Sequence, residues 1–453
     1  MNATLSSAAK MMRGSFHGDD RTYAGVSTDT RQLQRGELFF ALSGPNFEGE
    51  DFVGQARDKG AAGAVVGALL DEPIAQIAVN DTKLALGRLG AAWRQQHSVT
   101  VIGITGSNGK TTLKEMTAAC LSQSASTLAT QGNLNNEIGM PLMLLRISKS
   151  HRFAVLEMGA SRAGEIAYLT SLAMPDVVVI NNAAAAHLEG FGSLEGVAAA
   201  KGEILQGSKR PGMAILNADD DFFELWLSLV DDVEVLTFGI ENKADICADG
   251  IELAAGTTRF QLHLPDAEIE IELPLAGRHN VLNACAAAAI ATALGVSADQ
   301  IKAALESVHA VEGRLQPVNG RHDATVYDDS YNANPLSVVV AGEFIASLSG
   351  ESWFVLGDMK ELGDAADAMH HDVGSALKRA GVDRLFATGE RCRHAVEGFG
   401  ENASWFESAD DLAAAVLAEL TGSVSVLVKG SRSMRMERVV EALRAPDALR
   451  KGA

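Results

Sequence analysis

The sequence predicts an α/β protein of three domains: a small N-terminal α/β domain, a central domain with a mostly parallel sheet, and a C-terminal Rossmann-like α/β domain. Three observations support this prediction. The chain has 453 residues, enough for about two or three domains. Val- and Ile-rich runs alternate with helical stretches through its middle, as in parallel sheets covered on both faces. A second set of such runs, each ending in glycine, follows residue 314.

The predicted N-terminal domain comprises residues 1–83. Residues 37–42 (ELFFAL) suit a strand, residues 52–60 suit a helix, and residues 63–66 begin another apolar strand. This order indicates a small α/β unit.

The predicted central domain comprises residues 84–313. Its strands are expected at 99–104, 153–156, 177–180 and 213–216, and its helices include 111–123, 194–206 and the Ala-rich 280–294. Residues 268–273 alternate charged and apolar side chains, which is typical of an exposed antiparallel strand.

The predicted C-terminal domain comprises residues 314–453. Strands are expected at 353–357, 384–389 and 425–430, with helices between them. This second open sheet has no phosphate-binding loop of its own. In such sheets, ligands bind at the carboxyl ends of the strands.

Bulk composition narrows the function classes. The formal net charge is −20, which argues against a nucleic-acid-binding protein. The four cysteines form no CxxC pair and are expected to be buried thiols of a reducing compartment. The first residues, MNATLSSAAKMMRG, have no apolar signal core, and the longest uncharged apolar run (284–296) is too short to span a bilayer. We expect a soluble, cytoplasmic protein without stable membrane insertion.

The most informative motif is VTVIGITGSNGKTT at residues 99–112. Gly106 and Gly109 allow backbone N–H groups to approach an anion. Lys110 supplies a charge for the β- and γ-phosphates, and Thr111 supplies a hydroxyl for Mg²⁺. The strict pattern G-x-x-x-x-G-K-[ST] fails because residue 104 is Ile. We therefore predict a variant site for a nucleoside triphosphate.

Two further residues suit metal or phosphate chemistry. Glu157 ends the run FAVLEMG at the sheet edge where the phosphate loop is expected, so its carboxylate suits Mg²⁺; the alternative is a solvated acid at a strand end. His187 follows the strand-like VVVINN. Its imidazole can bind a metal or orient a phosphate, or it is a loop histidine with satisfied hydrogen bonds.

The remaining candidates have stronger structural alternatives. Lys201 is flanked by alanines, and by itself this pattern favours a solvated helix residue. Arg314 lies at a predicted domain junction, where it can contact a γ-phosphate or form an interdomain salt bridge. The acidic pair 328–329 opens the third region beside it. The triple acid 219–221 and the pair His370–His371 are interpreted as loop or helix surface rather than metal ligands.

A set of motifs resembles a known family. TGSNGKTT, LEMG, HLEGFGS, GRHNVLNA, EGR and YDDSYNANP occur in this order and together resemble the ATP-dependent Mur ligases of peptidoglycan synthesis, over nearly the whole chain. GNLNNEIGMPL, DDSYNANPLS, GDMKELG and VKGSRSMRME are most similar to the member that joins D-alanyl-D-alanine to UDP-N-acetylmuramoyl-tripeptide. The N-terminal STDTRQLQRGELFFALSGPNFEGEDF does not discriminate, since the member adding diaminopimelate or lysine has a similar segment.

The family's phosphate loop, T-G-x-N-G-K-T, matches residues 105–111 and accounts for the mismatch at Ile104. The resemblance implies ATP and Mg²⁺ as cofactors. It implies that nucleotide is bound by Thr105, Gly106, Ser107, Asn108, Gly109, Lys110, Thr111, Thr112, His279, Asn283, Arg314 and Asp329. Lys110, His187, Lys201 and Arg314 would be the catalytic residues.

The resemblance also implies metal and substrate ligands. Thr111 and Glu157 would hold the first Mg²⁺, and His187 would support the second. Lys201 matches a lysine that is carbamylated in several members, which would make it a carboxylate-like metal ligand. The substrate-binding residues would be Ser27, Asp29 and Arg31 for the uridine diphosphate, together with Asn136 and Asn334.

The function implied is ATP-driven amide synthesis through an acyl phosphate, by a monomer whose third domain rotates to close the site. Within the same class, the alternatives are a Mur ligase adding a single amino acid or a folylpolyglutamate synthetase-like enzyme. In a different class, a P-loop switch would hydrolyse ATP without an amine acceptor and control a partner protein. Phosphate release with different amines separates these hypotheses.

Overall fold

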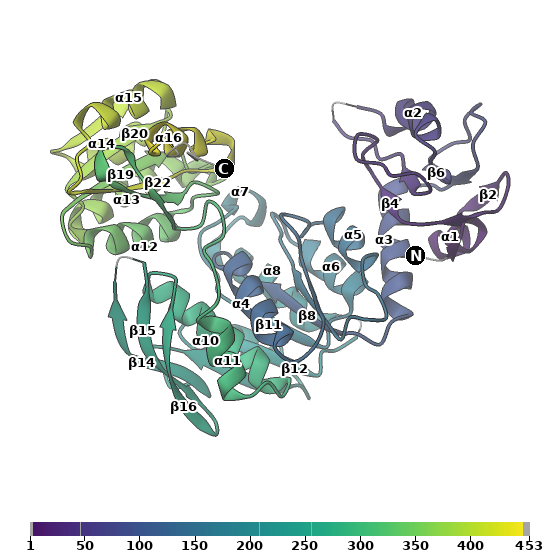
Figure 1. Cartoon of the computed structure of the whole chain (residues 1–453), viewed down its shortest axis with the longest axis horizontal. Helices are drawn as coiled ribbons and strands as arrows, with labels where there is room; N and C mark the ends of the chain where they lie inside the picture. Colours follow the sequence, from purple (N-terminus) through teal and green to yellow (C-terminus); the bar gives the residue numbers. More distant parts are fainter. Residues whose placement is uncertain (1–2, 46, 208, 255, 447–453) are drawn as a thin grey trace, which may run out of the picture.

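The computed structural model describes residues 3–45, 47–207, 209–254 and 256–446. The predicted first and last domains extend to residues 1 and 453, which lie outside the described residues. Figure 1 shows three α/β bodies in chain order, with the central body between the N-terminal and C-terminal ones. No helix in the described part of the chain has the length and apolar character needed to cross a bilayer.

The N-terminal body is a five-stranded sheet in the order β2-β7-β6-β5-β4, in which β2 is antiparallel and the other neighbours are parallel. Its strands are β2 (Ser15–His17), β4 (Val26–Ser27), β5 (Leu38–Phe40), β6 (Gly63–Val66) and β7 (Gln76–Ala78), and a short ribbon joins β1 (Ala3–Thr4) to β3 (Thr22–Tyr23). The helices are α1 (Leu5–Met12), α2 (Val53–Asp58) and α3 (Thr82–Gln95). The boundary predicted after residue 83 therefore falls in the first turn of α3, which also packs on helices of the central body.

The central body is a nine-stranded sheet in the order β16-β15-β14-β13-β12-β11-β8-β10-β9. The strands from β9 to β14 are parallel, and β14, β15 and β16 form an antiparallel extension. Their bounds are β8 (Thr100–Thr105), β9 (Thr127–Ala129), β10 (Phe153–Glu157), β11 (Val177–Ile180), β12 (Met213–Asn217), β13 (Glu234–Gly239), β14 (Ile246–Leu253), β15 (Thr258–Leu264) and β16 (Ala267–Leu273).

Helices cover both faces of the parallel part of this sheet, as the alternating pattern predicted. On one face pack α4 (Lys110–Ser122), the Ala-rich α10 (Arg278–Ala293) and α11 (Ala298–Leu305). The core of the other face includes residues of α5 (Gly139–Leu144), α6 (Glu165–Ala173), α8 (Leu194–Gly202) and α9 (Phe223–Leu227). Strand β11 (Val-Val-Val-Ile) is buried throughout, and its successive side chains enter the two cores in turn. Because both faces of this strand are covered, its sequence is continuously apolar.

The C-terminal body is a six-stranded sheet in the order β17-β18-β22-β19-β20-β21, parallel except for β17. Its strands are β17 (Gln316–Asn319), β18 (Thr325–Asp329), β19 (Glu351–Gly357), β20 (Arg384–Thr388), β21 (Ala403–Phe406) and β22 (Val424–Lys429). Its helices are α12 (Pro335–Ala346), α13 (Ala366–Ala380), α14 (Cys392–Phe399), α15 (Ala409–Glu419) and α16 (Glu437–Leu443). The chain is thus α/β with three parallel-rich sheets.

Candidate active site

The phosphate loop joins the carboxyl end of β8 to the start of α4. Gly109 has φ +76°, and a Cβ at this position would lie 2.6 Å from Asn283 Oδ1, so glycine is required on both counts. No side chain in the described parts of the chain caps the first turn of α4. Its backbone N–H groups and the positive end of its dipole are therefore available to an anion.

Lys110 lies across this loop. Its Nζ donates hydrogen bonds to the carbonyl oxygens of Gly106 at 2.7 Å and Ser107 at 3.2 Å. Burial lowers the pKa of Lys110, and the neighbouring Arg314 lowers it further while Glu157 opposes the shift. The ammonium is thus held by neutral acceptors, and a bound phosphate would supply the counter-charge that favours its charged form.

Glu157 ends β10, beside Ile104 of the adjacent strand β8. The residue is 3% exposed, and its carboxylate accepts hydrogen bonds from Thr111 Oγ1 at 3.0 Å and Asn135 Nδ2 at 2.7 Å. Within the described residues, no basic side chain forms an ion pair with it. A buried carboxylate beside a hydroxyl, whose hydrogen-bond partners described here are Thr111 and Asn135, is a donor set that suits a hard cation such as Mg²⁺.

Buried polar atoms without a partner surround the same loop. Asn108 Nδ2, Asn181 Oδ1 and His279 Nδ1 each lack a hydrogen bond in the described structure. Leaving such an atom unsatisfied costs about 1–3 kcal/mol, so clustering of three at one place indicates a ligand-binding site.

A cavity of about 90 Å³, hereafter the small cavity, opens beside the phosphate loop, between α10 and the C-terminal body. His279, Asn283, Arg314 and Asp329 line it, as do Gly109 and Thr112 of the phosphate loop. Asn283 Oδ1 accepts a hydrogen bond from Asn181 at 2.9 Å. Burial lowers the pKa of His279 to about 4, so its imidazole is neutral at neutral pH. All six lining residues named here are among those that the family resemblance assigned to the nucleotide.

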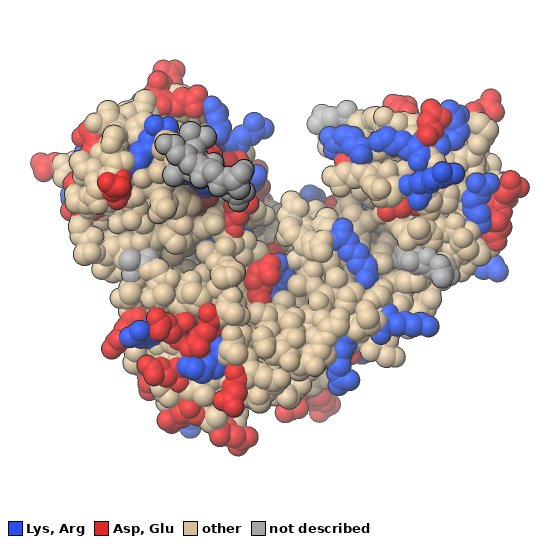
Figure 2. Space-filling model, in the orientation of Figure 1, with Lys and Arg blue, Asp and Glu red and all other residues tan. Residues whose placement is uncertain are grey.

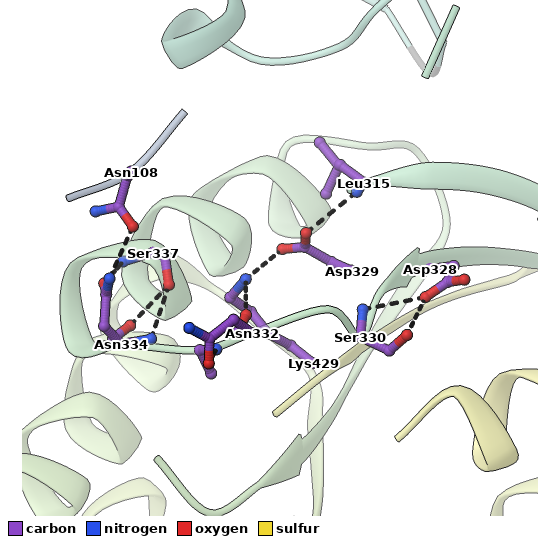
Figure 3. Close-up of polar contacts among 10 residues, drawn as sticks. Asn108, Leu315, Asp328, Asp329, Ser330, Asn332, Asn334, Ser337 and Lys429 are labelled. Atoms are coloured by element: carbon purple, nitrogen blue, oxygen red, sulfur yellow. Dashed lines mark hydrogen bonds and ion pairs between the residues drawn. The ribbon is translucent and has the colours of Figure 1, made fainter. Parts of the chain in front are cut away.

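The C-terminal body presents the carboxyl ends of β18 and β22 to the central body. Asp329 and Lys429 are register partners at these ends, and their ion pair measures 2.6 Å (Figure 3). Lys429 also donates to the Asn332 carbonyl, and the Leu315 backbone N–H donates to the other Asp329 oxygen. Asp329 therefore fixes the connection between the two bodies as well as lining the small cavity.

Asn334 connects this body to the phosphate loop. It is the N-cap of α12, where its Oδ1 accepts from the Ser337 N–H, and Pro335 occupies the first helical position. Its Nδ2 donates to Asn108 Oδ1 at 2.7 Å (Figure 3).

Arg314 lies at the connection to the C-terminal body. Its guanidinium carbon is 4.1 Å from the centroid of the Tyr331 ring, and the Tyr331 N–H donates to the Gly313 carbonyl. The described residues give Arg314 no ion pair, so the salt bridge considered as an alternative is not found among them.

His187 is the N-cap of α7 (Leu188–Phe191) and has φ +55°. Its Nδ1 contacts the carboxylate of Glu361, which lies after β19 in the C-terminal body, and the Glu189 N–H donates to the Glu361 carbonyl at 3.2 Å. This is a second polar connection between the central and C-terminal bodies.

The environment of Lys201 differs from the solvated helix position that its flanking alanines favoured. The residue is 2% exposed rather than solvated, and its ammonium lies 5.3 Å from the centroid of the Phe191 ring. Burial, with a smaller contribution from Lys110, lowers its pKa to about 7. The flanking alanines indicated an exposed helix position. In the structure α8 packs against α6 and α7, and this packing buries Lys201.

His370 also differs from expectation, because it is fully buried whereas His371 is exposed. Its Nδ1 bonds to the Ala366 carbonyl at 2.6 Å, and its Nε2 accepts the Met359 N–H at 3.0 Å. Asp358 and Cys392 lie beside it, but both imidazole nitrogens are already used. The group orders the loop after β19 rather than offering a metal site. The acids at 219–221 do lie in a loop, where Asp219 accepts backbone N–H groups of residues 240–242.

The residues predicted for the uridine diphosphate lie apart from the phosphate loop. Ser27 and Asp29 line a cavity of about 810 Å³ between the N-terminal body and the end of α5. Arg31 pairs with Asp29, which lowers the pKa of that carboxyl, and its side chain is 86% exposed and does not line the cavity. Asn136 instead lines the cavity that the phosphate loop also lines, and its Oδ1 accepts the Gly139 N–H at the start of α5.

A cavity of about 420 Å³, hereafter the interdomain cavity, brings these elements together. It is lined by residues 107–111, Glu157, His187, Arg314 and Asn334, and by residues that sequence reasoning did not select: Asn135, Tyr331, Asn332, Lys429 and Arg432. These lie in segments of the family motifs, but nothing in the pattern singled them out individually. Figure 2 shows the molecule hollowed between its N-terminal and C-terminal bodies, with acidic and basic side chains on the central body at the base.

Comparison with known proteins places these features in context. Models described as Mur ligase family, catalytic domain, as Mur ligase middle domain and as Mur ligase, glutamate ligase domain match residues 22–119, 104–291 and 313–432. The chain is 44% identical over 447 residues to the UDP-N-acetylmuramoyl-tripeptide–D-alanyl-D-alanine ligase of Escherichia coli, covering 98% of both chains. A crystal structure of MurF from Acinetobacter baumannii superposes with a TM-score of 0.92 at 37% identity, covering 97% of this chain and 98% of that one. MurF ligase from Thermotoga maritima in complex with ADP superposes with a TM-score of 0.82 at 27% identity, covering 92% and 96%.

Proposed function

The chain belongs to the Mur ligase family, and we propose that it works as the family's dipeptide-adding enzyme in peptidoglycan synthesis. It is an ATP-dependent ligase that joins D-alanyl-D-alanine to UDP-N-acetylmuramoyl-tripeptide and so forms the pentapeptide. The observation that carries the proposal is the interdomain cavity, where the phosphate loop and the polar ends of β18 and β22 meet.

ATP binds with its phosphates on the loop at residues 105–112. The free N–H groups at the start of α4 and the Lys110 ammonium face the phosphates, and the orphaned Asn108 amide gains a partner. The nucleoside extends toward the small cavity formed by His279, Asn283 and Asp329.

The oxygen donors at the loop suit Mg²⁺. Thr111 and Glu157 would hold a first ion, and His187 with a carbamylated Lys201 would hold a second. Bound Mg²⁺ offsets the negative charge on the transferring phosphoryl group. Lys201 supports this assignment because a pKa of about 7 leaves much of its amine neutral and able to react with carbon dioxide.

The UDP-linked substrate reaches the site from the N-terminal body. We assign its nucleotide to the cavity of Ser27 and Asp29, with Arg31 able to join it by leaving Asp29. Asn136, at the start of α5 on the interdomain cavity, is placed to contact the peptide end.

The chemistry then has two steps. The terminal carboxylate of the tripeptide attacks the γ-phosphorus of ATP, ADP leaves, and Lys110 and Arg314 stabilise the charge on the transferring group. The neutral amine of the dipeptide attacks the carbonyl of the acyl phosphate, the tetrahedral intermediate expels phosphate, and the amine loses a proton. The cavity must exclude water, because water would hydrolyse the acyl phosphate.

Rotation of the C-terminal body closes the site over the phosphates. Such a rotation would make and break two contacts between the bodies, Asn334 with Asn108 and Glu361 with His187. We further propose a cytoplasmic monomer that binds no nucleic acid. One chain supplies every residue assigned above, and a net charge of −20 repels nucleic acid.

The test is phosphate release from ATP in the presence of UDP-N-acetylmuramoyl-tripeptide and a panel of amines. We expect D-alanyl-D-alanine to stimulate release and single amino acids such as D-glutamate, lysine and diaminopimelate to be inert. Stimulation by a single amino acid would assign another ligase activity. Release that needs no amine would instead favour a nucleotide switch.

A further inference from the structure

Among the residues that the structure describes, five lysine and arginine side chains line the interdomain cavity: Lys110, Arg162, Arg314, Lys429 and Arg432. Three of them already have a role. Lys110 lies on the phosphate loop, and Arg314 also lines the small cavity proposed for the nucleoside. The ammonium of Lys429 is buried in its ion pair with Asp329. Arg162 and Arg432 remain.

The acceptor of the proposed reaction carries a charge that the reaction does not use. A dipeptide attacks through its amine, and its own carboxylate remains ionised in the cavity. A charge enclosed in this way needs a cation, and the planar guanidinium of arginine matches a carboxylate with two parallel hydrogen bonds.

Arg432 is tied to Arg314 through one aromatic ring. The guanidinium carbons of Arg314 and Arg432 lie 4.1 Å and 5.8 Å from the centroid of the Tyr331 ring, so the two are less than about 10 Å apart. An extended dipeptide spans roughly 7 Å, and a single amino acid spans roughly half of that. With its amine beside the phosphate that Arg314 contacts, a dipeptide has the length to place its carboxylate at Arg432.

The local structure favours Arg432 over Arg162. Arg432 follows β22, at the carboxyl end of the C-terminal sheet, where open α/β sheets bind ligands. Its side chain is 64% exposed, and among the described residues its one ion pair is to Glu437 at 3.3 Å, which does not use all five of its N–H donors. Arg162 pairs with Glu165, and that carboxylate also accepts the Ser161 and Arg162 N–H groups, so this pair belongs to a turn.

We propose that Arg432 binds the carboxylate of the incoming dipeptide, with Tyr331 fixing its distance from Arg314. The inference rests on the proposed function. The charge at the far end of the acceptor then takes part in its selection, because Arg432 binds a carboxylate while the amine of the same molecule is at the reacting carbonyl.

The test compares D-alanyl-D-alanine with its C-terminal amide as acceptors, for the wild type, Arg432→Gln and the matched control Arg438→Gln. Arg438 lies on α16 and pairs with Asp410 at the surface. For the wild type and the control, we expect the amide to raise KM roughly 10- to 100-fold, the effect of losing a charged hydrogen-bond partner. Arg432→Gln should raise KM for the dipeptide by a similar factor, leave KM for ATP unchanged, and no longer distinguish the two acceptors.

An undiminished preference for the free carboxylate in Arg432→Gln would overturn the proposal, as would loss of that preference in Arg162→Gln instead. Thermal unfolding of each variant identifies any that is misfolded, and Arg432→Lys then provides a charge-retaining substitute that should keep part of the preference. Failure of the proposed function is distinct, because in that case the wild type itself would show no dipeptide-stimulated phosphate release.

Discussion

Asn334 donates a hydrogen bond of 2.7 Å to Asn108, joining the first turn of α12 to the phosphate loop across 226 positions of sequence. The contact couples the C-terminal body to the loop on which ATP is proposed to bind. Asn334 makes two separate interactions: its Oδ1 caps α12, and its Nδ2 donates to Asn108. Substitutions can remove one interaction and keep the other.

Replacing Asn334 with Ser keeps an N-cap oxygen but removes the donor to Asn108. We expect Asn334→Ser to lower kcat about tenfold, equivalent to roughly one hydrogen bond, with little change in thermal stability. Asn334→Ala should lose the cap as well and be destabilised by about 1 kcal/mol. Equal kcat for Asn334→Ser and the wild type would show that the contact has no part in turnover.

Lys110→Ala removes the ammonium that we propose faces the phosphates of ATP. Because this charge would act on the transferring group in an enclosed site, we expect dipeptide-dependent phosphate release to fall by several orders of magnitude. Lys302→Ala is a suitable control, since that lysine pairs with Glu306 on α11 and is remote from the loop. Near-normal release by Lys110→Ala would contradict the assignment of this loop.

Lys201 is expected to carry a carbamate. Its pKa of about 7 means that the neutral, reactive amine increases as pH rises through 7 and is lost below it. Carbon-13-labelled bicarbonate should therefore give a carbamate NMR signal that grows with pH and disappears in Lys201→Arg. The same signal in the variant would place the carbamate elsewhere.

His279 should make stability depend on pH. Its pKa is about 4 in the folded protein against 6.5 for the free side chain, so between these values the unfolded chain binds more protons and stability rises with pH. Acidification from 6.5 toward 4 should remove up to roughly 3 kcal/mol from this group. Comparing thermal unfolding of the wild type and His279→Gln across this range measures it, and parallel curves would refute the prediction.

The sequence predicted the elements whose pattern is local. The strand at β11 and the loop between β8 and α4 follow from continuous apolar runs and glycine placement, and the structure has both. Strand β18 was not predicted because it ends in Asp328–Asp329, an acidic pair that is typical of a loop. Strands β14 and β15 were not predicted because their exposed faces are polar.

Side-chain environments that depend on distant packing were not predictable. Lys201 is buried because α8 packs on neighbouring helices, and His370 because α13 folds over the loop after β19. The contact of His187 with Glu361 joins residues 174 positions apart. The sequence around each of these three residues, Lys201, His370 and His187, carries no signal of these neighbours.

The most direct test of the account follows the oxygen atoms. UDP-N-acetylmuramoyl-tripeptide with heavy oxygen in its terminal carboxylate is incubated with ATP and D-alanyl-D-alanine, and the released phosphate is analysed by mass spectrometry. Ligation through an acyl phosphate predicts that one labelled oxygen moves into each phosphate formed, in step with pentapeptide synthesis. Unlabelled phosphate, its new oxygen taken from water, would contradict the central claim that ATP activates the tripeptide carboxylate.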